Sequence, residues 1–203
     1  MKVDRSRIID EALALLNEVG VDALSTRLLA QRLGVQQPAL YWHFRNKRAL
    51  LDAMNGEILA RGHLHQIPRP GEDWRGFFLA NAHSFRAALL AYRDGARVHA
   101  GTEAQPEEVG QHEQQLRIFV DAGFPVGEAM ELLVAVGRYT VGCVLEEQTQ
   151  ALQGSEPQAV LDAAAEAYPL MAEAMSYYRR STHATLFEAG LILMADGAAA
   201  RLG

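Results

Sequence analysis

A short segment near the N-terminus combines aromatic rings with positive charge. Residues 41–48 read Tyr-Trp-His-Phe-Arg-Asn-Lys-Arg, so four consecutive rings are followed by three basic side chains. Successive residues of a helix are about 100° apart, and four rings therefore span about 300° of its circumference. A core-facing stripe is only slightly wider than about 100°, so at least two of the rings must face outward. Exposed rings beside basic groups favour contact with the phosphates and thymine methyls of DNA over burial in a core.

Two further polar side chains have the spacing of DNA-reading residues. Arg27 lies in a predicted helix that ends at Gly34, and Gln37 begins the next predicted helix after a short turn. Two helices joined in this way are typical of the helix-turn-helix, whose second helix enters the major groove. Arg27 can grip guanine through O6 and N7, and Gln37 can pair with adenine or with a phosphate.

The charge is unevenly distributed along the chain. The whole protein carries a net charge of −6. Residues 1–48 nevertheless hold eight basic and five acidic side chains, a net +3, which leaves −9 for residues 49–203. Only the surface that faces a phosphate backbone has to be basic, so the asymmetry is compatible with an N-terminal DNA-binding segment. A chance fluctuation in a short segment is the alternative explanation.

The elements that position these residues are helices, because apolar residues recur at helical spacing along the chain. The predicted helices span about 5–19, 26–33, 37–44, 46–59, 73–90, 94–100, 107–121, 126–149, 158–178 and 182–201. Sustained two-residue alternation is absent, so no strand is expected. We therefore predict an all-α fold. Residues 1–46 form a three-helix head containing the helix-turn-helix, and residues 47–203 form a larger helical body.

Composition excludes several classes of protein. The single cysteine, Cys143, rules out an intramolecular disulfide framework. The N-terminus shows no signal-peptide pattern, and no apolar run is long enough to span a bilayer. We therefore expect a cytoplasmic protein.

Several motifs resemble the tetracycline repressor family, and the match is closest to its tetracycline-binding members. They are Leu24-Ser25-Thr26-Arg27, LAQRLGV at 29–35, QPALYWH at 37–43, NKRALLD at 46–52, Tyr92-Arg93-Asp94-Gly95-Ala96 and Gly142-Cys143-Val144-Leu145-Glu146. The resemblance fades between about 149 and 168. It implies a ligand-responsive repressor that binds a palindromic operator as a homodimer. The body is then a ligand-binding and dimerisation core, and helices near 126–149 and 182–202 pack as a four-helix bundle between subunits.

The resemblance also implies which residues contact DNA. By position these are Arg27, Gln37, Pro38, Ala39, Tyr41, Trp42, His43 and Lys47. Ala39 stands where the family has a hydroxyl residue, so we expect one hydrogen bond to DNA to be lost and the operator preference to change.

The ligand implied by the resemblance is a tetracycline chelated to Mg²⁺. By position, His99 binds the metal directly, whereas Thr102 and the other subunit's Glu146 hold it through waters. Few protein ligands and several waters are normal for Mg²⁺, which gives up its hydration reluctantly. The expected ligand-binding residues are His63, Asn81, Phe85, His99, Thr102, Gln115, Met130, Leu133 and Arg138. The loop near 99–106 is the expected trigger, since it joins the metal site to the helix that abuts residues 47–61.

Two departures from the family concern this pocket. Glu103-Ala104 replaces an arginine–proline pair, and Arg138 replaces a histidine. The first change puts an anion in place of a cation near the expected metal, and the second puts a permanent charge where a neutral ring can sit. We expect a pocket retuned for a different tetracycline-like polyketide, or a rearranged trigger loop.

Other functions stay open at this stage. A metal-dependent hydrolase would use His63, His65, His99 and Glu146, but the sequence contains no HExxH motif, nucleophile elbow or phosphate loop. We therefore predict that the protein is not an enzyme. A regulator of a different small molecule, an activator or a ligand-independent regulator would share the same head. No role is assigned to His83, His112 or His183.

Overall fold

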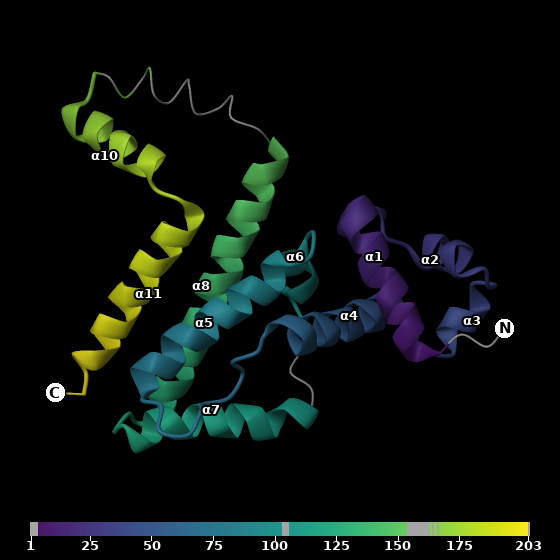
Figure 1. The fold of residues 1–203 in the computed structure, drawn as a ribbon, viewed down its shortest axis with the longest axis horizontal. Coiled ribbons are helices and arrows are strands. Elements are labelled where there is room, and N and C mark those ends of the chain that lie inside the picture. Colours follow the sequence, from purple (N-terminus) through teal and green to yellow (C-terminus); the bar gives the residue numbers. More distant parts are fainter. Residues whose placement is uncertain (1–3, 103–105, 154–162, 164, 166, 203) are drawn as a thin grey trace. The chain divides into compact units, whose positions relative to one another are not determined.

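The computed structural model describes residues 4–102, 106–153, 163, 165 and 167–202, and these residues contain helices and no strand. The predicted all-α fold is confirmed. The elements are α1 (Arg5–Ala23), α2 (Thr26–Leu33), α3 (Pro38–Tyr41), α4 (Lys47–Gly62), α5 (Trp74–Leu90), α6 (Gly95–His99), the 3₁₀ turn η1 (Pro106–Glu108), α7 (Val109–Asp121), α8 (Val126–Gln153), α10 (Pro169–Arg180) and α11 (His183–Ala199) (Figure 1). The chain divides into two compact units, residues 1–145 and residues 146–203.

The helices of the head begin and end where local side-chain chemistry dictates. The Ser25 hydroxyl accepts a hydrogen bond from the Leu28 N–H, which caps the start of α2. Gly34 ends the same helix in the left-handed conformation, with φ of 68°. Asn46 caps α4 by accepting from the Ala49 N–H at 2.8 Å. The two helices of the helix-turn-helix are thus fixed by signals within a few residues of their ends.

Two helices of the head differ from the sequence prediction. The helix predicted over 5–19 is interrupted at Gly20, but helix resumes after it as far as Ala23. Gly20 has φ of 78° and ψ of 169°, a conformation essentially restricted to glycine. The helix predicted to reach Phe44 ends at Tyr41, because the His43 N–H bonds the Leu40 carbonyl three residues back and tightens the last turn.

One hydrophobic core joins the head to the first helices of the body. It runs from Ile8 and Leu16 in α1 through Leu29 in α2 and Leu50 in α4 to Leu89 in α5, and all five side chains are buried. Helix α4 leads from the head into the body (Figure 1). Because α4 shares its core with both parts, a displacement of α4 must move the head.

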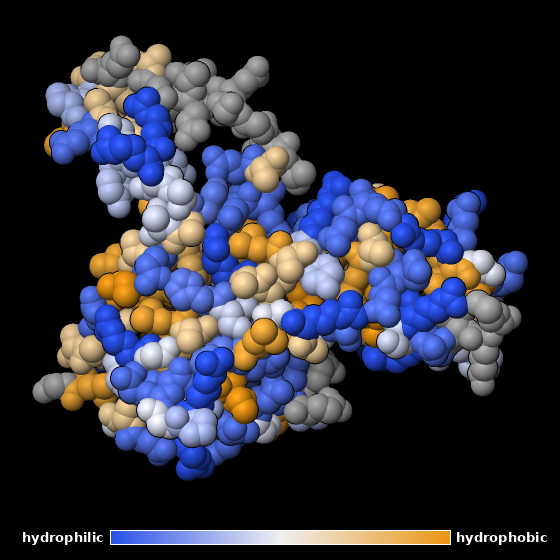
Figure 2. Space-filling view, in the orientation of Figure 1, coloured by the Kyte–Doolittle hydropathy of each residue, from blue (hydrophilic) through white to orange (hydrophobic). Residues whose placement is uncertain are grey.

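A second group of rings closes the far end of α5. Trp74 packs edge-on against Phe124 with ring centroids 5.0 Å apart, and Phe119 contacts both Phe77 and Phe124. This cluster fixes α7 against α5. The outward face of α7 is mainly hydrophilic (Figure 2), so one side of the helix packs on the ring cluster and the other faces solvent.

The second unit contains the last turns of α8 together with α10 and α11. His183 at the start of α11 lies 2.6 Å from Gln150 of α8, between Nε2 and Oε1. The helix predicted at 158–178 is seen as α10, Pro169–Arg180, and its earlier part lies mostly outside the described residues. None of the helices described in the structure has the length and apolar character needed to cross a membrane.

Candidate DNA-reading surface and ligand cavity

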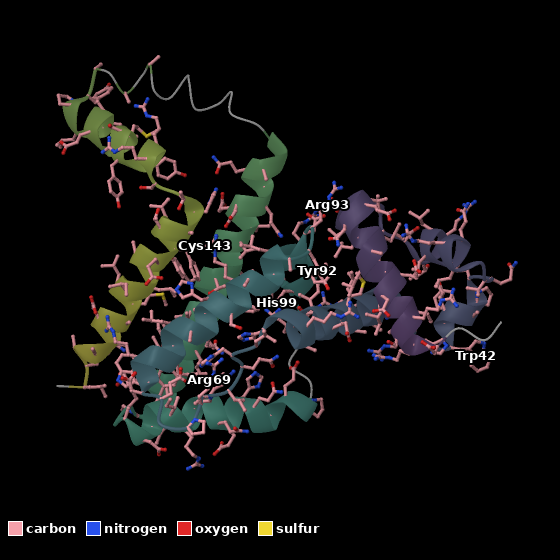
Figure 3. The ribbon with its side chains drawn as sticks, viewed as in Figure 1. Trp42, Arg69, Tyr92, Arg93, His99 and Cys143 are labelled. Carbon is pink, nitrogen blue, oxygen red and sulfur yellow. The ribbon has the colours of Figure 1, made fainter. Side chains whose placement is uncertain are left out.

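The ring-rich segment presents three of its four rings to solvent. Trp42 is 89% exposed and Tyr41 is 49% exposed, and His43 is exposed as well. Phe44 is only 4% exposed, and the Arg5 guanidinium lies 5.2 Å from its ring centroid. Trp42 stands at the outer end of the head (Figure 3). The prediction that at least two rings face outward is confirmed.

Gln37 is held at the start of α3 by its own side chain. Its amide nitrogen donates to the Thr26 hydroxyl at 2.9 Å and lies 3.2 Å from the Tyr41 hydroxyl oxygen. These contacts engage the nitrogen and leave the amide oxygen to accept a hydrogen bond from a base edge.

The other residues expected to read DNA also lie on the surface of the head. Arg27, Pro38, Ala39 and Lys47 are exposed. The Lys47 ammonium donates to the Val21 carbonyl at 3.0 Å, which holds the start of α4 against the end of α1. A DNA phosphate would therefore meet a lysine that is already positioned by the fold.

A cavity of about 510 Å³ lies within the first unit, bounded by helices α4 to α8. That volume is in the range of small-molecule sites. Eight of the nine residues expected to bind the ligand line it: His63, Asn81, Phe85, His99, Thr102, Gln115, Met130 and Leu133. Residues up to seventy positions apart in the sequence thus line one cavity, as the resemblance implies.

His63 is buried at the end of α4 and held by a polar network. Its Nδ1 lies 3.0 Å from the Ser84 hydroxyl, and its Nε2 lies 3.5 Å from the Asn81 amide nitrogen. The ring packs against Phe85 with centroids 5.5 Å apart. Burial lowers the pKa of His63 to about 4, and the charges of His65 and His99 add to the effect. His63 is therefore neutral at physiological pH.

His99 ends α6 and faces the same cavity (Figure 3). Its Nδ1 lies 3.0 Å from Oδ1 of Asn55 in α4, and its ring meets Phe85 edge-on at 5.0 Å between centroids. Burial lowers the pKa of His99 below its usual value. The neutral imidazole is the form that binds metals.

The structure also shows cavity residues that the sequence did not single out. Asn55, Gln66, His112 and Thr140 all line the cavity. Asn55 is 6% exposed and follows the buried Met54 in α4. The sequence signal for Asn55 was a polar residue within the buried face of a helix, because a buried polar side chain needs a hydrogen-bond partner.

Several expected site residues lie elsewhere. Arg138, which was also expected at the ligand, is exposed and is not among the residues that line this cavity. Its neighbour Gly137 faces the cavity, and the next position on a helix is turned by about 100°. Glu146 is exposed on α8 and belongs to the second unit. Glu103 and Ala104 lie outside the described residues.

The hydrolase arrangement is not assembled around the cavity. His65 is 7% exposed, and its Nε2 lies 2.9 Å from a Glu72 carboxylate oxygen. His65 does not line the cavity. Among the described residues, no group of three or more His, Cys, Asp and Glu side chains has the arrangement of a metal site.

The cavity suits a Mg²⁺ ion that arrives with its ligand better than a resident one. His99 offers one nitrogen, and the Thr102 hydroxyl, which donates to the His99 carbonyl at 2.7 Å, keeps its lone pairs available. Mg²⁺ keeps most of its oxygen ligands from water or from a chelating ligand. The residues present therefore fit a metal held mainly by non-protein oxygens.

The N-terminal end of α6 contacts the head directly. The Asp94 carboxylate is buried and accepts a hydrogen bond from the Val21 N–H at 2.9 Å. The Arg97 guanidinium holds both carboxylate oxygens of Asp22, at 2.9 and 2.7 Å. Arg93 and Tyr92 lie at the same junction (Figure 3). The five residues of α6 thus join the cavity to the last turn of α1.

Comparisons with known proteins agree with this layout. A family model described as "Bacterial regulatory proteins, tetR family" matches residues 8–54, and one described as "Tetracyclin repressor-like, C-terminal domain" matches residues 67–202. The tetracycline repressor protein class A from transposon 1721 of Escherichia coli is 49% identical over 200 residues, which cover 98% of this chain and 92% of that protein.

Two solved structures extend the comparison to three dimensions. TetR(class A) in complex with 5a,6-anhydrotetracycline and magnesium has a TM-score of 0.76 at 43% identity, covering 97% of this chain and 98% of that one. A TetR variant from Acinetobacter baumannii in complex with minocycline has a TM-score of 0.82 at 42% identity, covering 100% and 99%. With an exposed helix-turn-helix, a ligand-sized cavity and matches over nearly its whole length, the chain belongs to the tetR family of bacterial regulatory proteins.

Proposed function

We propose that the protein is a transcriptional repressor that leaves its operator when a Mg²⁺-chelated tetracycline or a tetracycline-like polyketide binds. The cavity is the observation that carries the proposal, because it gathers His63, Asn81, Phe85 and His99 around a ligand-sized volume. Similarity to proteins solved with anhydrotetracycline and magnesium, and with minocycline, supports the ligand class. When bound, the metal would supply a positive charge that attracts the ligand's chelating oxygens, and His99 would hold it from the protein side.

Different cavity residues would contact different parts of such a ligand. The neutral His63 and the Asn81 amide offer hydrogen bonds to an oxygen-rich edge, and Phe85 offers a flat apolar surface. The Gln115 amide nitrogen is engaged by the Gln66 carbonyl at 2.7 Å, so its oxygen is the group left for the ligand. Exclusion of water by these walls strengthens each polar contact.

Release would proceed through α6. His99 lies at the C-terminal end of this helix, and Asp94 and Arg97 connect its other end to α1. A ligand that binds better when His99 is displaced would favour an arrangement in which α6 no longer holds the head in its DNA-bound position. The ligand acts only through its different affinities for the two arrangements.

The reading unit would be a homodimer with two heads on successive major-groove turns of a palindrome. The helices expected to form the interface, near 126–149 and 182–202, carry exposed apolar side chains. Leu145 is 38% exposed and Leu193 is 74% exposed. Exposed apolar groups on a long helix favour burial against a second subunit.

A mobility-shift assay on the gene's own upstream DNA, with and without tetracycline and Mg²⁺, tests the proposal. The wild-type protein should bind the DNA and release it only when both are added. His99→Ala should keep operator binding and lose the metal-dependent release, because the direct metal ligand is gone. Trp42→Ala is the matched control in the head. It should lose operator affinity while calorimetry still detects ligand binding.

The proposal assigns ligand response to the cavity and operator binding to the head, so a variant of one part that lost the function of the other would count against it. If His99→Ala protein of normal helicity failed to bind DNA, the cavity and the head would not be separable in the way proposed. If Mg²⁺ and tetracycline failed to release the wild-type protein, a regulator of a different small molecule would be favoured. Glu103 motivates this second candidate, because the sequence has an acidic residue where the family has a basic one.

A further inference from the structure

We propose that Asn55 is a positioning residue that fixes the tautomer and the orientation of the His99 ring. The inference rests on the proposed function, in which His99 presents a nitrogen to the metal of the ligand complex. Asn55 is not among the residues expected to bind the metal or the ligand. Its role follows from one buried contact between α4 and α6.

The contact has the geometry of a directional hydrogen bond. Asn55 Oδ1 lies 3.0 Å from His99 Nδ1, within the normal range for an N–H donor and an amide oxygen. An amide oxygen only accepts, so Nδ1 must carry the proton in this pair. The neutral ring has one proton, and Nε2 is then the nitrogen with a free lone pair.

The surroundings of the ring leave Nε2 to the cavity. Phe85 packs edge-on against the ring, and Asn55 occupies Nδ1. The hydrogen bond that the structure gives for this ring is the one at Nδ1, and the Glu108 carboxylate, which lines the same cavity, acts on the ring through its charge. The ring is therefore held on one side by α4 and open on the other, which is how a metal-binding histidine is prepared by a neighbouring acceptor.

Burial makes this contact consequential. Asn55 is 6% exposed, and its side chain competes with few waters for the histidine proton. In Asn55→Ala the Nδ1–H would lose its acceptor, and the ring would be free to rotate or to move its proton to Nε2. A protonated Nε2 has no lone pair for a metal.

The first test measures the tautomer directly in the ligand-free, full-length protein. Long-range proton–nitrogen NMR of the histidine rings, at a pH where they are neutral, should show His99 protonated at Nδ1. The His99 signals are assigned by their loss in His99→Ala. Asn55→Ala should shift His99 towards the Nε2-protonated form, whereas Asn55→Asp, which keeps the acceptor, should retain the wild-type form.

Ser84→Ala is the matched control, because Ser84 is the partner of the other cavity histidine. It should alter the ring signals of His63 and leave those of His99 unchanged. Wild-type His99 protonated at Nε2, or an unchanged tautomer in Asn55→Ala, overturns the proposal. These outcomes require no ligand, so they stand whether or not tetracycline proves to be the inducer.

The second test measures the consequence for binding. Loss of a residue that orients a metal-binding histidine typically weakens metal affinity about 10- to 100-fold. Titration with Mg²⁺ and tetracycline should show a weakening of that size in Asn55→Ala and recovery in Asn55→Asp. If tetracycline binds neither variant nor wild type, the proposed function fails and the tautomer result still decides the role of Asn55. Equal affinities of Asn55→Ala and wild type would overturn the positioning role.

Discussion

Burial of charged and polar side chains gives the cavity its chemical character. His63 shows this most clearly, because burial lowers its pKa to about 4 and the ring stays neutral where a free histidine is partly charged. A neutral ring can offer one donor and one acceptor to a ligand, whereas a charged ring offers only donors. The same burial therefore sets both the binding chemistry and the response of the fold to acid.

The acid response of the fold follows from the lowered pKa of His63. The unfolded chain binds a proton on this histidine below a pH of about 6.5, whereas the folded chain does so only near pH 4. The contribution of His63 to the free energy of unfolding is therefore fully present above about pH 6.5. It is lost as the pH falls towards 4, and the loss is about 3 kcal/mol at most. Urea unfolding of ligand-free protein at about pH 7.5 and about pH 4.5 measures the loss.

His63→Gln is the comparison that isolates this effect. The variant lacks the titrating ring, so its stability should fall less between the two pH values, by about 2 kcal/mol. The carboxylates and the histidines outside this group titrate in both proteins and cancel in the difference, whereas His65 and His99 interact with His63 and contribute to the effect that is measured. An identical pH dependence in the two proteins would show that His63 is protonated as easily in the folded chain as in the unfolded one.

At the level of helices, the turn at Gly20 shapes the junction between α1 and α6. Its φ of 78° and ψ of 169° are adopted by almost no residue but glycine. A Cβ at this position would lie 2.9 Å from Asp94 Oδ2 and 3.1 Å from Arg93 Nε. Gly20→Ala should therefore combine backbone strain with steric conflict and cost about 2–4 kcal/mol of stability.

Gly34→Ala is the matched control for this prediction. Gly34 also has a positive φ, 68°, but nothing lies within 4 Å of a Cβ built there. Only the left-handed backbone has to be strained, at about 1 kcal/mol. Chemical denaturation of the two variants compares the costs directly. Equal destabilisation would mean that close packing against α6 contributes nothing at Gly20.

The helices were largely predictable because their boundaries depend on neighbouring residues. Ser25, Gly34 and Asn46 act at the ends where their types predict caps. The end of α3 at Tyr41 was missed, because a tightened turn leaves no mark on the apolar pattern. The pairing of Asn55 with His99 joins residues 44 positions apart, and periodicity gives a residue's face without its partner. The site positions came from the family resemblance, and the contacts that orient them came from the structure.

For the whole molecule, the proposed function requires operator and ligand to oppose each other. Coupling between two binding sites is reciprocal, so the factor by which the ligand weakens operator binding equals the factor by which the operator weakens ligand binding. The path runs through α6, where Asp94 accepts from the Val21 N–H. Removing this acceptor leaves a buried N–H unsatisfied, at a cost of about 1–3 kcal/mol.

Asp94→Gly should therefore reduce the coupling factor, by up to about tenfold, and by the same amount in both directions. Glycine tolerates the φ of 57° at this position, so the change removes the carboxylate without adding backbone strain. Arg97→Ala is the control, because it leaves the hydrogen bond between Asp94 and the Val21 N–H in place. It breaks an exposed ion pair with Asp22, worth less than about 1 kcal/mol, and a longer contact of 3.6 Å with Asp94, so the coupling should stay nearly intact. The measurement is ligand affinity with and without saturating operator, paired with operator affinity with and without saturating ligand. A loss of coupling in Arg97→Ala but not in Asp94→Gly would place the connection between cavity and head outside the Asp94 hydrogen bond.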